Sequence, residues 1–306
     1  MTLETFFTRL ARHGSAPRSD WPFGEDPESY GLVVKDDRLL PAGRFDPLVP
    51  GAIQQALSRQ AASWLQRLDV HPVIGSTNAE LMAEAQQRSV DGCVSMAELQ
   101  LRGRGRRGRR WSSPFGANLA ISIGVALDRP ASALGGVSLV VGLAVLDVLE
   151  ALEVSDLSLK WPNDILLGDA KLGGILIEMV RRNGIELVVG IGLNVVLPEP
   201  IRAVLPPGVA DLSHTTPLPS RSFLAGRVIS SVTQFVHEFE RMGFAPFRPA
   251  FDARHRYRGR HCRVLQGDRS IQGIVTGVGD DGELILQTSE GLRTFHGGEV
   301  SLRADG

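Results

Sequence analysis

The feature that most constrains the fold is a run of three closely spaced strand-like segments in the middle of the chain. Apolar residues bounded by turn residues predict strands over 157–167, 172–181 and 185–195. The last two are separated by Asn183-Gly184, which is typical of a tight hairpin turn. Because so short a turn joins only antiparallel neighbours, this part of the chain must form an antiparallel sheet.

Further helices and strands are predicted on both sides of this run. The strands are 71–74, 92–98 and 118–127, and the helices are 52–68, 132–153 and 221–241. Another helix follows Ser76-Thr77-Asn78, where Thr77 and Glu80 have the spacing of a capping box. The proline-rich stretch 196–220 is interpreted as a loop. Hairpins with a few helices indicate an α+β protein with a central mixed, mostly antiparallel sheet.

The two ends of the chain differ from this middle part. At the N-terminal end we predict a helix over 2–12 capped by Thr2, a loop over 14–28, a hairpin over 30–40 and a linker over 41–50. After Arg258, short strands alternate with turns at 267–268, 280–282 and 289–291, which indicates a small β-barrel. We therefore expect three domains, over 1–50, 51–256 and 257–306.

The composition is that of an ordinary globular protein. A chain of 306 residues buries a full core without a metal or a disulfide. Its net charge of −1 points neither to nucleic acid nor to a membrane surface. The two cysteines are far apart, and the apolar stretch 134–149 is shorter than a membrane span requires. With no signal-peptide pattern at the start, we expect a cytoplasmic protein without membrane contact.

Arginine and glycine alternate in a loop between residues 102 and 110. Residues 103–108 match G-x-G-x-x-G, but no helix follows and no ribose-binding acid stands nearby, so we reject a dinucleotide site. A solvated loop or a nucleic-acid patch is the plain alternative. Glycines that let backbone N–H groups approach an anion, together with Trp111, favour a phosphate or carboxylate site.

Lysine is rare in this chain, so its placement is informative. It stands only at Lys35, Lys160 and Lys171, while the other basic residues are arginines. Two of the three lie close together on adjacent predicted strands, and the first begins Lys-Trp-Pro-Asn-Asp over 160–164. A turn with a surface lysine is one interpretation. A compact ammonium beside a reacting group is the other, because arginine cannot replace it there.

Glycines also interrupt two predicted strands, at residues 173–174 and at 190 and 192. Such glycines mark the close approach of a ligand or another backbone, or simple sheet packing under a helix. We find no Ser-His-Asp arrangement and no histidines with the spacing of metal ligands. Neither a nucleophilic triad nor a protein-bound metal is expected.

Taken in order, these motifs closely resemble the biotin protein ligase family, in particular the bacterial biotin–[acetyl-CoA-carboxylase] ligases. The matching segments are 76–78, Gln100, 103–109, Trp111, 113–118, 160–164, 171–178, 190–194 and 297–303, within a resemblance that covers about residues 64–303. It implies the biotin/lipoate ligase catalytic fold, an SH3-like C-terminal β-barrel, and a short N-terminal winged-helix remnant.

The resemblance implies a reaction in two steps. The biotin carboxylate attacks the α-phosphate of ATP, which gives biotinyl-5′-AMP and pyrophosphate. A lysine ε-amine of the biotin carboxyl carrier protein of acetyl-CoA carboxylase then takes the biotin. The implied ligands are therefore biotin and ATP, with Mg²⁺ entering alongside ATP.

The resemblance also implies roles for individual residues. The catalytic group comprises Lys160, Arg104 and Arg106, whose cations offset the repulsion between two anions that must meet. Contacts to biotin or the adenylate are implied for Ser76, Thr77, Asn78, Gln100, Arg104, Gly105, Arg106 and Lys160. The nucleotide side is implied to comprise Arg109, Trp111, Asn163, Lys171 and Asn194.

Two alternative functions stay open from the sequence. One is a lipoate or octanoyl transferase, which shares the catalytic fold. The other is a biotin-sensing repressor, which needs a basic recognition helix that the acidic loop over 15–29 does not supply. We expect no DNA binding and interpret the remnant as a packing or dimer-edge element, which leaves a homodimer open. Deleting residues 1–45 is accordingly expected to spare biotinylation.

Overall fold

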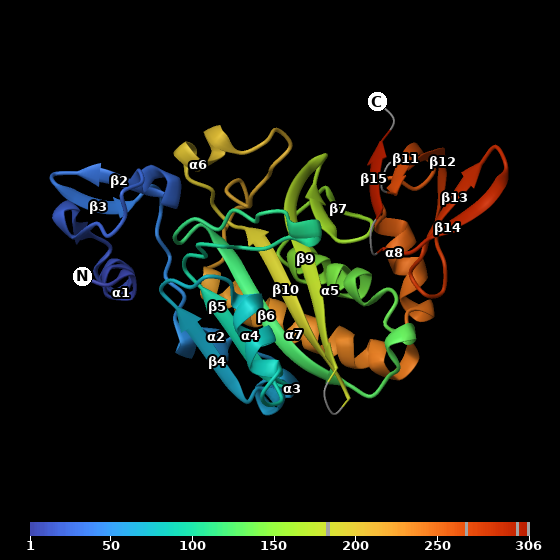
Figure 1. The fold of residues 1–306 in the computed structure, drawn as a ribbon, viewed down its shortest axis with the longest axis horizontal. Coiled ribbons are helices and arrows are strands. Elements are labelled where there is room, and N and C mark those ends of the chain that lie inside the picture. Colours follow the sequence, from blue (N-terminus) through green and yellow to red (C-terminus); the bar gives the residue numbers. More distant parts are fainter. Residues whose placement is uncertain (182–183, 267–268, 298–299, 305–306) are drawn as a thin grey trace.

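The computed structural model describes residues 1–181, 184–266, 269–297 and 300–304. Within them the chain forms three β-sheets with helices packed around the largest one (Figure 1). The expected turn at 267–268 lies outside the described residues, and so does Asn183 of the expected hairpin turn. None of the described helices is long and apolar enough to cross a membrane.

The central sheet has seven strands in the order β4-β5-β6-β10-β9-β8-β7. Their bounds are β4 Arg67–His71, β5 Cys93–Ala97, β6 Asn118–Leu127, β7 Leu157–Lys160, β8 Asp164–Leu167, β9 Ala170–Arg181 and β10 Ile185–Asn194. Strands β4 and β5 run parallel, while every other neighbouring pair in this sheet is antiparallel. The expected mixed, mostly antiparallel sheet is confirmed.

The two faces of this sheet have different neighbours. Helices α5 (Val137–Ala151) and α7 (Arg221–Met242) lie behind the sheet in Figure 1, and α4 (Thr77–Ala85) lies in front. Strand β10 alternates accordingly. Val189 and Ile191 belong to the main core with α5 and α7, while Val188 packs with residues of α4. Because side chains alternate along a strand, Gly190 and Gly192 then face the α4 side.

The C-terminal unit is a five-stranded sheet in the order β14-β13-β12-β11-β15. Its strands are β11 His261–Gln266, β12 Arg269–Val278, β13 Leu284–Thr288, β14 Gly291–Phe295 and β15 Val300–Ala304. Helix α8 (Arg248–Arg254) leads into it. Its buried side chains belong to the same core cluster as the central domain. The expected small C-terminal β-barrel is confirmed.

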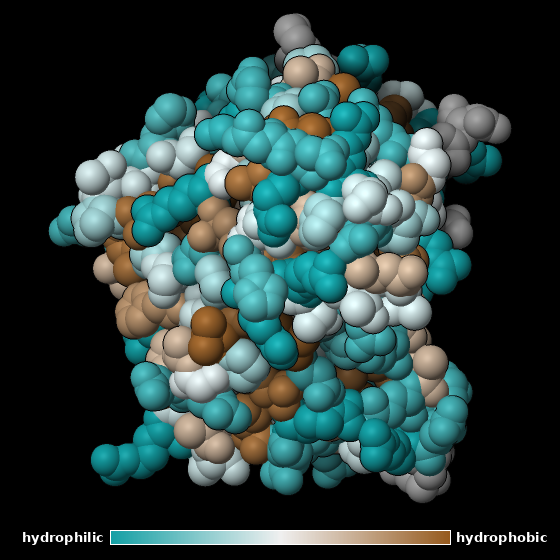
Figure 2. Space-filling model, turned by 90° about the vertical axis from the view of Figure 1, so that its left-hand side faces the viewer, coloured by the Kyte–Doolittle hydropathy of each residue, from teal (hydrophilic) through white to brown (hydrophobic). Residues whose placement is uncertain are grey.

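The N-terminal unit, residues 1–45, lies at the opposite end of the molecule (Figure 1). It contains α1 (Leu3–His13), capped by Thr2, and a small sheet of β1 (Ala16–Pro17), β3 (Arg38–Pro41) and β2 (Leu32–Lys35). Its aromatic residues form a separate core cluster. Viewed from this end, the surface is mainly hydrophilic, with scattered apolar residues (Figure 2).

Several expected boundaries were wrong. The helix expected over 52–68 is two short helices, α2 (Pro50–Gln55) and α3 (Arg59–Trp64), because Ser58 caps a new helix. The last residues of the expected helix belong instead to β4, where Arg67 N donates to Gly92 O. The strand expected over 71–74 therefore begins earlier in the chain, at Arg67.

Two further boundaries were wrong around the turns. The single strand expected over 157–167 is the hairpin of β7 and β8, because Trp161 and Pro162 form the turn between them. The loop expected over 196–220 contains the short helix α6 (Glu199–Val204), which has a proline in its first turn, where proline is tolerated.

Candidate active site

A cleft of about 1000 Å³, including its mouth open to solvent, lies on the α4 side of the central sheet. It is bounded by the start of α4, the arginine–glycine loop, the turn between β7 and β8, the glycines of β9 and β10, and the end of the barrel. The expected site residues that line it are Ser76, Thr77, Asn78, Gln100, Arg104, Gly105, Arg106, Arg109, Trp111, Lys160, Asn163 and Lys171. Segments far apart in the sequence are thus brought to one place.

The lining is strongly electropositive. Among the described residues that line the cleft, eight are cationic and only Asp164 is acidic. The cations are Arg104, Arg106, Arg107, Arg109, Arg110, Lys160, Lys171 and Arg303. Low-dielectric walls strengthen such a field, so this cleft attracts anions.

The start of α4 is fixed by buried polar contacts. Ser76 Oγ accepts a hydrogen bond from Ala79 N, so Ser76 is the N-cap and the capping box expected from Thr77 and Glu80 was wrong. Thr77 N donates to Gln100 Oε1 at 3.0 Å instead. Such interlocked partners hold side chains in one geometry without ligand.

Asn78 lies directly over β10 because that strand carries a glycine at this point. A Cβ atom on Gly190 would lie 2.3 Å from Asn78 Oδ1. Ser122 Oγ lies 2.5 Å from the same oxygen, and Asn78 Nδ2 donates to Glu178 at 3.0 Å. Every side-chain polar atom of Asn78 therefore has a partner, and the expected close approach at Gly190 is made by a side chain.

The arginine–glycine loop is closed by its own backbone. Trp111 N donates to Gly103 O at 2.9 Å, and Gly105 N donates to Arg109 O at 2.8 Å. A Cβ on Gly103 would lie 2.5 Å from Trp111 O, so this glycine is required for the closure. Inside the inner bond, Arg107 adopts a left-handed φ of 59°. This turn presents neighbouring arginines on different sides.

Two arginines of this loop are held from opposite directions. Arg104 lies 3.0 Å from Glu178 and is half-exposed. Arg106 donates to Asn163 Oδ1 at 2.9 Å and to the carbonyl oxygen of Gly297 in the barrel. Burial lowers the pKa of Arg106, whose guanidinium stays charged at neutral pH. The C-terminal unit thus helps to position a residue of the cleft.

The two lysines of the cleft have different surroundings. Lys160 ends β7, and burial lowers the pKa of its ammonium. Lys171 Nζ lies 2.5 Å from Asp164 Oδ1 and 5.7 Å from the centre of the Trp111 ring. Trp111 itself covers β10, where a Cβ on Gly192 would lie 2.5 Å from its ring. Lys171 is thereby fixed by a carboxylate, whereas Lys160 is not in such a pair within the described residues.

Asn194 is the one expected site residue that does not line the cleft. It is buried at the end of β10, where its Nδ2 donates to Ala210 O at 2.9 Å. Asn118 stands opposite in the register and donates to Asn194 Oδ1 at 3.5 Å. Asn194 therefore holds the 208–210 segment against the sheet.

Sequence reasoning missed several members of the cleft. They are Ser122 beneath Asn78, Asp164 beside Lys171, and Leu302 and Arg303 from the barrel. Ser122 lies within an ordinary strand sequence and had no signal. Asp164 stood in the quoted Lys-Trp-Pro-Asn-Asp motif without a role, and its pairing with Lys171 required the register of β8 with β9.

Comparisons with known proteins agree with this geometry. A family model described as the biotin/lipoate A/B protein ligase family matches residues 70–195, and one described as the biotin protein ligase C terminal domain matches residues 258–303. The chain is 35% identical over 261 residues to the bifunctional ligase/repressor BirA of Escherichia coli, covering 84% of this chain and 81% of that protein.

Two further relatives extend this match. The biotin–[acetyl-CoA-carboxylase] ligase of Mycobacterium tuberculosis is 34% identical over 275 residues, covering 86% of this chain and 97% of that protein. The structure of the Aquifex aeolicus biotin protein ligase with biotin and ATP superposes with a TM-score of 0.64 at 29% identity, covering 79% of this chain and 98% of that chain. With both family models matched in order around one electropositive cleft, the chain belongs to the biotin protein ligase family.

Proposed function

We infer that this chain is an ATP-dependent biotin–protein ligase of the biotin–[acetyl-CoA-carboxylase] type. The observation that carries this function is the cleft itself, whose described lining has eight cations and one acid. Adenylation must bring a carboxylate against a triphosphate, and fixed cations are what such a step requires. The ligase activity of the named relatives, and the biotin and ATP bound in the Aquifex aeolicus structure, support the same substrates.

In the first step, a carboxylate oxygen of biotin attacks the α-phosphorus of ATP, and the bond to the bridging oxygen of pyrophosphate breaks. We assign Arg104, Arg106 and Lys160 to the cations that neutralise the charge around this phosphorus. Removing one fixed donor of this kind typically costs about 3–4 kcal/mol of transition-state stabilisation. Ser76, Asn78 and their neighbours at the start of α4, with Gln100 and Gly105, are assigned to biotin and the adenylate.

In the second step, a lysine amine of the acceptor attacks the acyl carbon of biotinyl-5′-AMP. An amide bond forms, AMP leaves with the electron pair of the broken bond, and the amine loses its proton to solvent. Because the nucleophile belongs to the acceptor, this chain needs no serine or cysteine nucleophile. We assign Arg109, Trp111, Asn163 and Lys171 to the nucleotide side, and Asn194 to holding the segment beside it.

Mg²⁺ belongs to this proposal as the companion of ATP. Magnesium in nucleotide sites is held through one or two carboxylates and the phosphates, and Asp164 is the acid available in the described cleft. No group of three or more potential metal-binding side chains occurs among the described residues. When bound, Mg²⁺ would neutralise phosphate charge beside the reacting phosphorus.

The acceptor is proposed to be a biotin carboxyl carrier protein. A groove lined by Leu134, Ile177, Met179 and Glu283 shares the lining residues Arg106, Trp161 and Asn163 with the cleft. An acceptor lysine can enter by this route. We also propose a cytoplasmic location and the division into domains 1–50, 51–256 and 257–306, and a homodimer stays open.

The two alternatives are distinguishable. A lipoate ligase would be stabilised by lipoate rather than biotin, which a thermal-shift comparison measures. A repressor needs a helix for the major groove. The fully described segment 14–31 contains only β1 and two 3₁₀ turns, Arg18–Asp20 and Pro27–Tyr30. We therefore propose that the chain does not bind operator DNA, and a gel shift with biotinyl-5′-AMP present tests this.

The decisive experiment measures pyrophosphate release with ATP, Mg²⁺ and biotin, followed by labelling of a carrier domain. Lys160→Arg should abolish most adenylate formation with folding intact, because the guanidinium cannot replace the ammonium. Lys35→Arg, at the exposed end of β2 in the N-terminal hairpin, is the matched control and should behave like wild type. Full activity of the Lys160 variant would remove that residue from the catalytic group.

A further inference from the structure

The connection between the central domain and the barrel lies along the edge of the central sheet. After α8 ends, His255 forms a parallel bridge with Leu159 of β7, and Arg256 N donates to Leu159 O at 2.9 Å. The Arg256 side chain fastens this segment further, 2.6 Å from Asp169. The connection therefore behaves as a short extra strand beside β7, next to the residue that ends it, Lys160.

His255 anchors this segment from the inside. Its ring stacks on Phe251 of α8, with 5.3 Å between centroids and 26° between planes. It is 5% exposed, and burial lowers its pKa to about 4, so it is neutral at physiological pH. A neutral ring stacked on Phe251, in a segment whose backbone is bridged to β7, gives the next residues of the connection a defined position.

One consequence concerns Tyr257, two residues further along. Its ring faces the ammonium of Lys160, with 5.5 Å between Nζ and the ring centroid. Both side chains are partly buried. Within the described residues, no carboxylate lies in ion-pair contact with Lys160. An aromatic face within about 6 Å of an ammonium attracts it through the quadrupole of the ring.

We propose that Tyr257 is a positioning residue that seats the Lys160 ammonium for adenylate formation. This inference rests on the proposed function of the cleft. The aromatic ring holds the cation in place without supplying a negative charge. Asp164 stands opposite Lys160 in the register of β7 with β8 and acts on its charge, but the close ion pair of Asp164 is with Lys171. The incoming carboxylate and phosphate therefore have no ion-pair partner of Lys160 to displace among the described residues.

The physical reason is a matter of competition. A carboxylate partner would bind the ammonium more strongly, but the substrate anions would then have to displace it. An aromatic face orients the ammonium and shields one side from water, which strengthens its interaction with charge that develops during the reaction. Because Tyr257 shortly precedes β11, the junction with the barrel carries this contact.

The test compares two substitutions. Tyr257→Phe keeps the ring and removes the hydroxyl, whereas Tyr257→Leu removes the ring. We expect Tyr257→Leu to lower kcat for biotin-dependent pyrophosphate release about tenfold, the size of a partly desolvated cation–π contact. The KM for biotin should change less than about threefold, since the contact acts on the reacting groups. Tyr257→Phe should restore kcat to within about twofold of wild type.

Several outcomes decide the inference. A Leu variant with wild-type kcat overturns it, and so does a Phe variant as slow as the Leu variant, because the hydroxyl would then carry the effect. Thermal unfolding of both variants accompanies the kinetics. If Tyr257→Leu does not fold, Tyr257→Met fills the volume without a ring and is held to the same kinetic criterion. A wild-type enzyme that releases no pyrophosphate would contradict the proposed function instead.

Discussion

The two small β units at the ends of the chain are attached to the central domain in different ways. The buried side chains of the barrel, such as Val264 and Leu286, belong to the same core cluster as α5, α7 and the central sheet. The N-terminal unit has its own cluster around Phe6 and Phe7, which includes only Leu99 and Phe115 from the central domain as buried members. One unit continues the main core, and the other docks on it.

Their relation to the cleft differs in the same way. The barrel contributes lining residues and binds Arg106 and the turn before β8, where Trp161 Nε1 donates to Gly282 O at 3.0 Å. The N-terminal unit supplies no residue to the lining of the cleft, but it packs on Phe115 and Leu99, which lie next to segments of that lining. Phe115 N donates to Tyr30 O at 2.9 Å, and the Phe115 ring stacks on Phe45.

This contrast changes the expectation for the N-terminal deletion. The sequence predicted that residues 1–45 are dispensable for biotinylation. In the structure, they cover Phe115 and Leu99, which flank segments that line the cleft. The attachment also continues through residues 46–49 into a buried ion pair. We therefore expect the unit to matter, and the following predictions test how each end is coupled to the central domain.

The largest effect is expected at the ion pair that fastens the linker of the N-terminal unit. Glu98 and Arg221 are each 3% exposed and 2.6 Å apart, and Glu98 also accepts from Leu48 N. Removing one partner leaves an uncompensated buried charge, so Glu98→Ala should lower the free energy of unfolding by about 3–5 kcal/mol. Denaturant unfolding measures this. Glu150→Ala, from the exposed pair with Arg254, is the control and should change it by about 1 kcal/mol or less.

The next prediction separates the two cores directly with matched leucines. Leu286 in the barrel and Leu39 in the N-terminal unit are both fully buried. Each change to alanine should cost about 2–5 kcal/mol. Leu286→Ala should lower the temperature of the main calorimetric transition. Leu39→Ala should instead lower the temperature of a separate, smaller transition of the N-terminal unit, or make such a transition appear. If both variants shift a single transition alike, the two units are equally integrated and the contrast is wrong.

Deletion of residues 1–45 should impair catalysis more than stability of the central domain. Loss of the packing on Phe115 displaces residues next to the cleft, and small displacements of positioning groups cost activity. We expect the KM for biotin to rise by about tenfold or more, with the main unfolding transition retained. Steady-state pyrophosphate release together with calorimetry checks this. If the variant without residues 1–45 has wild-type kinetics, the N-terminal unit is dispensable for biotinylation, as the sequence suggested.

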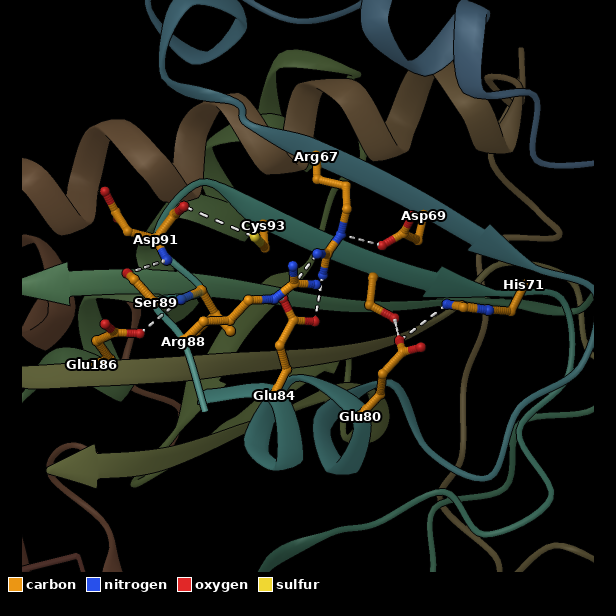
Figure 3. A network of polar contacts seen from close by, with 12 residues as sticks. Arg67, Asp69, His71, Glu80, Glu84, Arg88, Ser89, Asp91, Cys93 and Glu186 are labelled. Carbon is orange, nitrogen blue, oxygen red and sulfur yellow. Dashed lines mark hydrogen bonds and ion pairs between the residues drawn. The ribbon is translucent and has the colours of Figure 1, made fainter. Parts of the chain in front are cut away.

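The smallest expected effect is electrostatic and involves the polar network between α4 and strand β4 (Figure 3). The Glu80 carboxylate, 3.0 Å from His71 Nε2, raises the pKa of His71, and Glu4 of the N-terminal unit raises it further. This contribution to stability is complete below the usual histidine pKa of about 6.5 and is lost as pH rises through the raised value.

Glu4→Gln should therefore lower the pKa of His71 slightly, and Glu80→Gln should lower it more. An NMR titration of the imidazole measures both. Glu28→Gln, an exposed acid elsewhere in the N-terminal unit, is the control. If the pKa of His71 is the same in wild type and in the Glu4 variant, the N-terminal unit has no electrostatic effect on His71.

Much of the site could be predicted from local sequence. Strand or loop propensity does not explain the arginine–glycine loop, the sparse lysines or the glycines of β9 and β10. These features therefore indicated functional positions from the sequence alone. The antiparallel hairpin and the apolar α5 were equally readable, because a turn signal and an all-round apolar helix are properties of short segments.

Only the tertiary structure decided which distant groups meet. The pairing of Lys171 with Asp164 depends on the register of β8 with β9, and the seat of Lys160 on Tyr257 depends on a connection nearly 100 residues further along the chain. The same holds for the role of each end unit, since helix and strand patterns do not state whether a core is shared or separate. Sequence determines local conformation and chemistry through nearest neighbours, whereas long-range contacts follow from burying the whole apolar surface at once.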